Sequence, residues 1–315
     1  MAEPRLAWLF PGQGAQEPGM GRDLFDGSPA ARRVFETADR VLDYSVTNDC
    51  FEGPAEHLQE THVAQPALFA ASLACLEAAR ELGGLPESPP AFVAGHSLGE
   101  YTALVAAGAL GLEDGLRLVR ERGRLMRQAA EANPGAMAAI LGLDEATVSA
   151  ICDEAGAEVC NLNAPGQIVI GGVSQAVESA MALALERGAS RGVRLKVSGG
   201  FHTSLMRPAV EGMRVAVADT PLRDPNVPVV ANTTGEPITT AEALRDELVR
   251  QIAAPVQWQR SVEYLRAQGV DGVIEFGPGR VLTGLVRRID RAFAVRNVSD
   301  LASARSQADP APAPP

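Results

Sequence analysis

The sequence has few of the residues that build metal sites, disulfides and nucleic-acid-binding surfaces. Its 315 residues include four cysteines, and none of them belongs to a CxxC pair or has a neighbouring histidine, which argues against a metal site. We expect these cysteines to be reduced and structural. Lysine occurs once, as Lys196, and the formal net charge is -11, so no basic stripe is present that would release counterions from a phosphate backbone. The composition therefore argues against general nucleic-acid binding.

Long hydrophobic runs are also missing. No run reaches the length of a membrane span, and the N-terminus MAEPRLAWLFPG lacks the basic start and long apolar core of a signal peptide. We therefore expect a soluble, cytoplasmic protein. With 46% hydrophobic residues, the chain can form one large domain or two unequal ones, each with a packed core.

Apolar strands that alternate with helical patterns predict an α/β fold. The run LAWLF at 6–10 predicts a buried strand that stops at PGQG, and PPAFVAGHS repeats this strand-to-turn pattern at 89–97. Such alternation is typical of a parallel sheet covered on both faces. Further elements are expected as helices over 30–42, 66–82, about 240–252 and 259–268, and as strands near 228–232 and over 272–276.

The segment from about 135 to 197 shows a different order of elements. Its patterns predict βαββαβ, the ferredoxin-like arrangement, with Asp144 as the N-cap of the first helix. We expect a small inserted domain over 130–197, within a large α/β-hydrolase-like catalytic domain made of 1–129 and 198–304. The tail 305–315, which contains SQADPAPAPP, has too little apolar content to pack and is expected to be disordered.

The stretch AGHSLGEY places Ser97 between Gly95 and Gly99 in a G-x-S-x-G pattern. The glycines permit the tight strand-to-helix turn that lifts a serine side chain above the edge of a sheet. The apolar FVA before it and the helical YTALVAAGAL after it supply the context that this motif needs. Ser97 is therefore a candidate nucleophile, and a structural glycine turn is the alternative.

A nucleophilic serine needs a base, and the chain has four histidines. His96 is adjacent to Ser97, and since consecutive side chains diverge at a sharp turn, we expect it to pack or hydrogen-bond beneath the turn. His57 and His62 lie in a polar connection that favours exposed or capping histidines. His202 follows SGGF, where a strand leaving the small domain meets a loop that can face a cleft. We assign the base to His202.

An ordinary α/β-hydrolase shares the serine motif. Such enzymes usually place the catalytic histidine late in the chain, whereas no histidine follows His202 here, and an HGGG-type oxyanion loop is absent. The PGQG turn after the first strand can offer backbone N–H groups instead. The N–H of Gln13, together with that of Leu98, makes a plausible oxyanion hole.

Arg122 stands in the apolar stripe of a predicted arginine-rich helix. Its neighbours one turn away on either side are Leu118, Val119, Leu125 and Met126. A guanidinium on a core-facing stripe needs an anionic partner, because an unpaired buried charge is costly. That partner is either a carboxylate of the chain or a substrate carboxylate held by the bidentate fork of arginine. The second choice makes the serine selective for dicarboxylic acyl groups.

Several motifs occur in a fixed order, namely LFPGQGAQ, GHSLGEY, RGRLM, GAMAAI, NAPGQIVIGG, SGGFHTSLM, APVQW and EFGPGRVLTGL. On these motifs the chain resembles the bacterial malonyl-CoA:acyl carrier protein transacylases, whose fold also occurs as the acyltransferase domains of polyketide and fatty acid synthases. The resemblance covers all but the last ten or so residues. It implies that Ser97 is acylated, that His202 is the base, that Arg122 pairs with the malonyl carboxylate, and that Gln13 and Leu98 donate to the oxyanion.

The resemblance also implies roles for residues that surround this set. The backbone carbonyl of Gln257 in PVQW is expected to orient the histidine, and Asn163 and Gln167 in NAPGQ are expected to line the cleft. Phe201 precedes the histidine, as is typical of malonyl-using polyketide acyltransferases, whereas serine is typical with methylmalonyl. The phenyl ring would fill the space of an α-methyl branch, an effect worth only ~1 to 3 kcal/mol. Leu98 is likewise common in malonyl-using members.

The function implied by the resemblance is a ping-pong transfer of the malonyl group from malonyl-CoA to the phosphopantetheine thiol of acyl carrier protein, in fatty acid biosynthesis. We expect the enzyme to be a monomer that needs no metal or cofactor. The alternatives are a trans-acting malonyl acyltransferase of a polyketide synthase, a serine acyl-thioester hydrolase and a silent carrier-binding protein. Acyl carrier proteins are acidic, so a basic face is expected for docking. The candidates are Arg187, Arg191, Arg194 and Lys196, with a plain solvated surface as the alternative.

Overall fold

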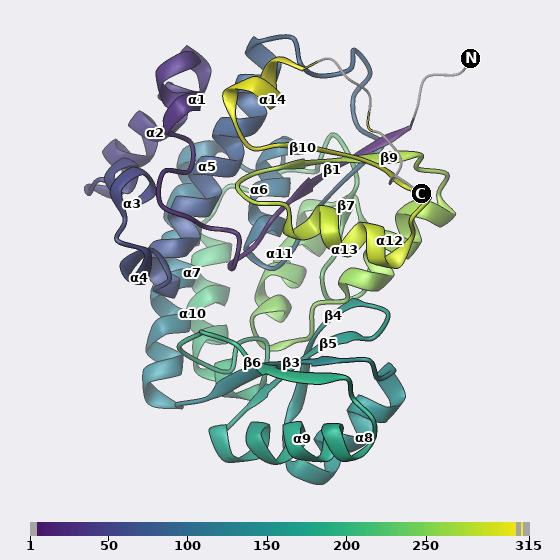
Figure 1. The fold of residues 1–315 in the computed structure, drawn as a ribbon. Helices are drawn as coiled ribbons and strands as arrows, with labels where there is room; N and C mark the ends of the chain where they lie inside the picture. Colours follow the sequence, from purple (N-terminus) through teal and green to yellow (C-terminus); the bar gives the residue numbers. More distant parts are fainter. Residues whose placement is uncertain (1–4, 307–309, 311–315) are drawn as a thin grey trace.

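The computed structural model describes residues 5–306 and residue 310, and in this part the chain folds around two β-sheets (Figure 1). The expected disordered tail lies outside the described residues, apart from Arg305, Ser306 and Pro310. Arg305 differs from that expectation, since it closes a helix, α14 (Leu301–Arg305). No helix in the described part is long and apolar enough to cross a membrane.

The larger sheet has six strands in the order β10-β9-β1-β2-β7-β8. Neighbouring strands run parallel except for the short β8, which returns antiparallel beside β7. The strands are β1 (Leu6–Phe10), β2 (Phe92–Gly95), β7 (Val229–Val230), β8 (Pro237–Ile238), β9 (Gly272–Phe276) and β10 (Ala294–Val298). The expected parallel sheet is therefore present, with one antiparallel edge strand in addition.

Helices cover both faces of this sheet (Figure 1). Alternate residues of β1 separate two cores, because successive strand side chains point to opposite faces. Leu6, Trp8 and Phe10 pack into one core with α5 (Thr61–Glu81), whereas Ala7 and Leu9 pack into the other with α12 (Trp258–Ala267) and α13 (Val281–Ile289). The remaining helices of this part are α1 (Arg22–Gly27), α2 (Pro29–Leu42), α3 (Val46–Glu52), α4 (Ala55–Leu58), α6 (Leu98–Ala106), α7 (Leu112–Ala132), α10 (Arg207–Ala218) and α11 (Ala241–Arg250), with the short 3-10 turns η1 (Ser204–Met206) and η2 (Gln251–Ala253).

The second sheet is antiparallel, with its four strands in the order β4-β5-β3-β6, and it lies at one end of the molecule (Figure 1). Its elements follow the expected βαββαβ order: β3 (Ala136–Leu141), α8 (Glu145–Ala155), β4 (Glu158–Ala164), β5 (Gln167–Gly172), α9 (Ser174–Glu186) and β6 (Arg191–Arg194). The Asp144 side chain caps α8 by accepting from the Thr147 N–H at 2.8 Å. Alanine, valine and isoleucine side chains of the sheet and both helices form a separate core.

A short parallel bridge ties the second sheet to the segment before α12. The Leu162 N–H donates to the Val256 carbonyl at 2.9 Å, and the Val256 N–H donates to the Cys160 carbonyl at 2.8 Å. The bridge pairs Asn161 of β4 with Val256, and Asn161 is one of the residues that line the pocket containing Ser97.

Candidate active site

Ser97 occupies the sharp turn between β2 and α6. Its φ of 51° and ψ of -105° are unusual for a residue with a side chain, and such strain is frequent at functional positions. A Cβ on Gly95 would lie 1.9 Å from the Gly99 carbonyl carbon, and one on Gly99 would lie 2.0 Å from the Phe10 carbonyl oxygen. Since neither position has room for a side chain, the two glycines of the motif are what allow the turn.

His202 reaches Ser97 from the loop that follows the second sheet. Its Nε2 lies 2.8 Å from Ser97 Oγ, and its Nδ1 lies 2.9 Å from the Gln251 carbonyl oxygen. A carbonyl only accepts, so Nδ1 carries the hydrogen and Nε2 is left to accept the serine proton. Burial, together with the nearby Arg122, lowers the pKa of His202 to about 3, which keeps the imidazole neutral. The pair therefore has the geometry of a nucleophile and its general base.

The carbonyl that orients His202 belongs to Gln251, so the prediction of Gln257 was wrong. The Gln257 carbonyl accepts instead from the Ser261 N–H at 3.0 Å, inside the first turn of α12. Gln251 follows α11 directly and begins the η2 turn. Carbonyls at the end of a helix lack intrahelical donors, which leaves this oxygen available to a side chain.

Arg122 projects from α7 toward Ser97 and is only 1% exposed. Its Nη1 donates to Gln65 Oε1 at 2.8 Å, and its Nη2 donates to Gln251 Oε1 at 2.8 Å and to Ser97 Oγ at 3.0 Å. The guanidinium lies over the ring of Tyr101, and its Nε has no hydrogen-bond partner in the described part of the chain. Within the described residues, no carboxylate forms an ion pair with Arg122. Of the two partners considered from the sequence, a chain carboxylate in direct contact is therefore not observed.

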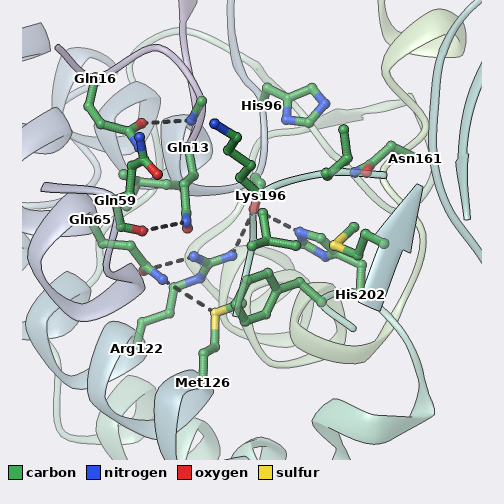
Figure 2. A pocket seen from close by; sticks show the side chains of 17 residues that line it. Gln13, Gln16, Gln59, Gln65, His96, Arg122, Met126, Asn161, Lys196 and His202 are labelled. Atoms are coloured by element: carbon green, nitrogen blue, oxygen red, sulfur yellow. Dashed lines mark hydrogen bonds between the residues drawn. The ribbon is translucent and has the colours of Figure 1, made fainter. Parts of the chain in front are cut away.

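A cavity of about 400 Å³ opens in front of Ser97. In Figure 2, Arg122 and His202 point toward one another across it, and Lys196 extends away from Arg122. Among the described residues that line it are the cations Arg122 and Lys196 and no aspartate or glutamate. Its residues are Gln13, Gly14, Gln16, Gln59, Gln65, His96, Ser97, Leu98, Arg122, Met126, Met137, Asn161, Leu195, Lys196, Val197, Phe201 and His202. The charge of the cavity therefore suits an anionic ligand.

Three residues expected beside the catalytic pair do line this cavity, namely Gln13, Leu98 and Phe201. The PGQG turn approaches the serine turn closely, since a Cβ on Gly12 would lie 2.3 Å from the His96 carbonyl oxygen. This close approach places the backbone of Gln13 next to the serine turn.

Asn163 and Gln167 are not among the lining residues, contrary to expectation. Asn163 lies behind His96, where its Oδ1 is 2.9 Å from the imidazole Nε2. Gln167 begins β5, and its Oε1 accepts from Arg288 Nη1 at 2.6 Å on α13. The neighbouring Asn161 faces the cavity instead.

Sequence reasoning missed three buried amides that hold this site together. Gln65 and Gln251 accept from Arg122, and Asn232 Oδ1 accepts from the Ser97 N–H at 2.6 Å. Gln65 carried a signal, because it is a polar residue within the apolar run VAQPALFAA of α5 and is 1% exposed. Asn232 follows β7 at the carboxyl end of a parallel strand, where ligand-binding residues gather.

A strained serine with a neutral histidine, beside a buried guanidinium that has only neutral partners, defines a site for serine-dependent acyl transfer. Residues 7–306 match the family model described as acyl transferase domain, and the chain belongs to this family. It is 44% identical over 301 residues to the malonyl CoA-acyl carrier protein transacylase of Bacillus subtilis, with 94% of each chain covered.

Solved structures agree with this assignment. The acyl-carrier-protein-S-malonyltransferase of Bartonella henselae superposes with a TM-score of 0.92 at 42% identity, covering 95% of this chain and 97% of that one. A malonyl-transacylase in complex with its type II PKS acyl-carrier protein superposes with a TM-score of 0.91 at 41% identity, covering 95% and 97% of the two chains.

Proposed function

We propose that this acyltransferase moves the malonyl group from malonyl-CoA to the phosphopantetheine thiol of acyl carrier protein through a malonyl ester on Ser97. The observation that carries the proposal is the guanidinium of Arg122, which is buried beside Ser97 Oγ with only uncharged hydrogen-bond partners. A buried charge without an anion is costly, and the free carboxylate of a malonyl group supplies one. The names of the similar proteins support the same substrate pair.

The first half-reaction loads the serine. His202 Nε2 takes the proton of Ser97 Oγ, which attacks the thioester carbonyl of malonyl-CoA. We assign stabilisation of the resulting oxyanion to the backbone N–H groups of Gln13 and Leu98, which both line the cavity. When the C–S bond breaks, the protonated His202 returns the proton to the leaving thiolate of coenzyme A.

The second half-reaction reverses these roles. His202 takes a proton from the phosphopantetheine thiol of the carrier, the thiolate attacks the malonyl ester, and Ser97 Oγ leaves with that proton. Arg122 holds the malonyl carboxylate throughout, so the ester keeps one orientation while coenzyme A departs and the carrier arrives. The proposed steps use only groups of the chain, the malonyl-CoA thioester and the thiol of the carrier, so no cofactor has a role in them.

Substrate binding changes the resting hydrogen bonds of the nucleophile. Without substrate, Arg122 Nη2 donates to Ser97 Oγ at 3.0 Å, which occupies a lone pair of the oxygen that must attack. A carboxylate is a stronger acceptor than a hydroxyl, so malonyl binding draws this donor away from Ser97. An acetyl group cannot do so, which favours malonyl in the attack step as well as in binding.

The docking face proposed for the carrier narrows to two of the four expected residues. Arg187 pairs with Glu154, and Arg194 pairs with Glu178 at 2.8 Å, so neighbouring carboxylates offset these charges. Arg191 is exposed, and Lys196 lines the cavity that holds Ser97. We propose that Lys196 attracts the phosphate-bearing phosphopantetheine of coenzyme A or of the carrier as it enters this cavity.

We further propose that 130–197 form a ferredoxin-like domain inserted in an α/β-hydrolase-like domain of 1–129 and 198–304. The strand order β4-β5-β3-β6 and the βαββαβ succession support the first description. Helix α7 continues to Ala132, three residues into the small domain. Cytoplasmic location and a monomeric state stay predictions.

A role in a type II polyketide pathway is the second candidate function, supported by the similarity to the malonyl-transacylase solved with its PKS carrier.

The proposal is tested by intact mass spectrometry after mixing the protein with malonyl-CoA or with acetyl-CoA, with Ser97→Ala in parallel. We expect a malonyl adduct that requires Ser97 and exceeds the acetyl adduct. Equal loading of both acyl groups would contradict the role of Arg122, and steady release of free malonate without carrier would show a hydrolase.

A further inference from the structure

A buried carboxylate lies one amide away from Arg122. Glu100, on α6, is 1% exposed, and its Oε2 accepts from Gln251 Nε2 at 2.5 Å. The Oε1 of the same Gln251 side chain accepts from Arg122 Nη2 at 2.8 Å. The two opposite charges are therefore linked through a single amide and do not touch.

The direction of these hydrogen bonds is fixed. A guanidinium only donates, so the Gln251 amide must turn its oxygen toward Arg122 and its nitrogen toward Glu100. The other oxygen of Glu100 accepts from the Asn232 N–H at 2.8 Å and from Asn232 Nδ2 at 3.2 Å. Every one of these neighbours donates to Glu100, and such donors stabilise the ionised carboxylate. Burial and the nearby Glu247 raise the pKa of Glu100 well above its usual value, although the donors from Asn232 and Gln251 and the charge of Arg122 act to lower it.

The same two amides hold the nucleophile. Gln251 Nε2 also donates to the Ser97 carbonyl at 2.9 Å. Asn232 Oδ1 accepts from the Ser97 N–H, and Asn232 Nδ2 donates to the Gly95 carbonyl at 2.6 Å. Asn232 therefore links Glu100 to the strained peptide of Ser97. Gln251 links Glu100 to the guanidinium of Arg122.

We propose that Glu100 is a positioning residue for recognition of the acyl carboxylate, acting on Arg122 through the Gln251 amide. The inference rests on the proposed function and deepens it. A carboxylate in direct contact with Arg122 would compete with the acyl group for the guanidinium. Because the Gln251 amide lies between the two side chains, Glu100 stabilises the positive charge of Arg122 and fixes the orientation of its guanidinium. The guanidinium stays available to the substrate.

The substitution Glu100→Gln tests this inference with a change of one atom. If the amide nitrogen of the introduced glutamine faces Gln251, it meets Gln251 Nε2, and both groups are donors. Gln251 can remove this conflict only by rotating its amide, which turns its nitrogen toward the donor of Arg122. If the amide nitrogen faces Asn232 instead, it meets the N–H and the Nδ2 group of that residue, which are also donors. Glu247→Gln is a matched control, because Glu247 is 3% exposed but accepts from Thr233, whose hydroxyl at 2.5 Å can donate or accept.

Transfer from malonyl-CoA and from acetyl-CoA to holo-acyl carrier protein is measured for both variants, as kcat/KM, kcat and KM, with the melting temperature of each. Glu100→Gln is expected to lower the malonyl-to-acetyl ratio of kcat/KM by about tenfold to a hundredfold, chiefly through the KM for malonyl-CoA, as for loss of one hydrogen bond to a charged group. Glu247→Gln removes a like charge near Glu100 but keeps the contacts of Glu100 to Gln251 and Asn232, so it is expected not to lower the ratio. A purely structural Glu100 would lower both activities together.

The inference is overturned if Glu100→Gln keeps the wild-type ratio, or if both variants change it equally. Glu100→Asp decides the matter should Glu100→Gln fail to fold, since it keeps an acceptor-only carboxylate but shortens its reach to Gln251. An unchanged ratio in that variant also overturns the inference. If the wild-type protein shows no preference for malonyl, the proposed function fails first, and the two failures are thereby distinguished.

Discussion

Replacement of Arg122 by methionine removes the guanidinium but keeps a long side chain in the same place. The variant takes a charge-assisted donor from Gln65 and another from Gln251. It also removes the proposed contact to the malonyl carboxylate. Loss of one partner of a buried hydrogen-bonded charge pair costs roughly 2 to 5 kcal/mol, which corresponds to a fall in kcat/KM for malonyl-CoA of about thirtyfold to several thousandfold. Acetyl-CoA has no carboxylate to lose, so its loading should change far less.

The assay is single-turnover loading of Ser97, quenched in acid and read as intact mass, with malonyl-CoA and acetyl-CoA in parallel. Arg124→Met is the control on the same helix, because Arg124 is exposed and forms an ion pair with Glu121, away from the cavity lining. Its acyl preference should equal that of the wild type. A malonyl preference that survives in Arg122→Met would refute the reasoning, since it would show that another group reads the carboxylate.

Three further predictions concern titration, packing and charge. The folded-state pKa of His202, about 3 against the usual 6.5, means that the unfolded chain binds one more proton between these values, so stability falls as pH drops below 6.5. In urea unfolding, the wild type should lose about 1 kcal/mol more than His202→Asn between pH 7 and pH 5.5, and equal losses would contradict the shift. Gly99→Ala should lower stability and abolish loading because its Cβ meets a backbone oxygen at 2.0 Å, whereas Gly284→Ala, with nothing within 4 Å, should raise stability by about 0.5 to 1 kcal/mol. Thermal melts that rank these two alanine variants in the opposite order would refute the steric reading. Lys196→Gln should raise the KM for malonyl-CoA and for carrier protein with kcat unchanged, and an unaltered KM for both would remove the proposed attraction.

The sequence predicted well those features that depend on local chemistry. Apolar runs placed β1 and β9 within their observed bounds, because a buried strand needs an unbroken apolar stretch. The serine turn was also predictable, since only glycine fits at Gly95 and Gly99. By contrast β10, AVRNV, mixes polar and apolar residues and gave no such signal.

Features that depend on tertiary contacts could not be predicted in this way. The carbonyl that holds His202 belongs to the backbone, and since every residue has the same carbonyl, nothing local distinguishes Gln251 from Gln257. Glu100 lies three residues after Ser97 on a helix, where a glutamate is ordinarily exposed. In its buried position it accepts hydrogen bonds from Asn232, which lies far along the chain and follows strand β7.

In the proposed mechanism, one malonyl group passes from coenzyme A to a carrier protein by way of Ser97. The most direct test loads the protein with labelled malonyl-CoA, removes all free thioester, and then adds stoichiometric holo-acyl carrier protein, with apo-carrier as the control. We predict that the label leaves Ser97 and appears on the phosphopantetheine of the holo-carrier, whereas it stays on the protein with the apo-carrier. Label that remains on Ser97 with the holo-carrier, or appears only as free malonate, would contradict the account.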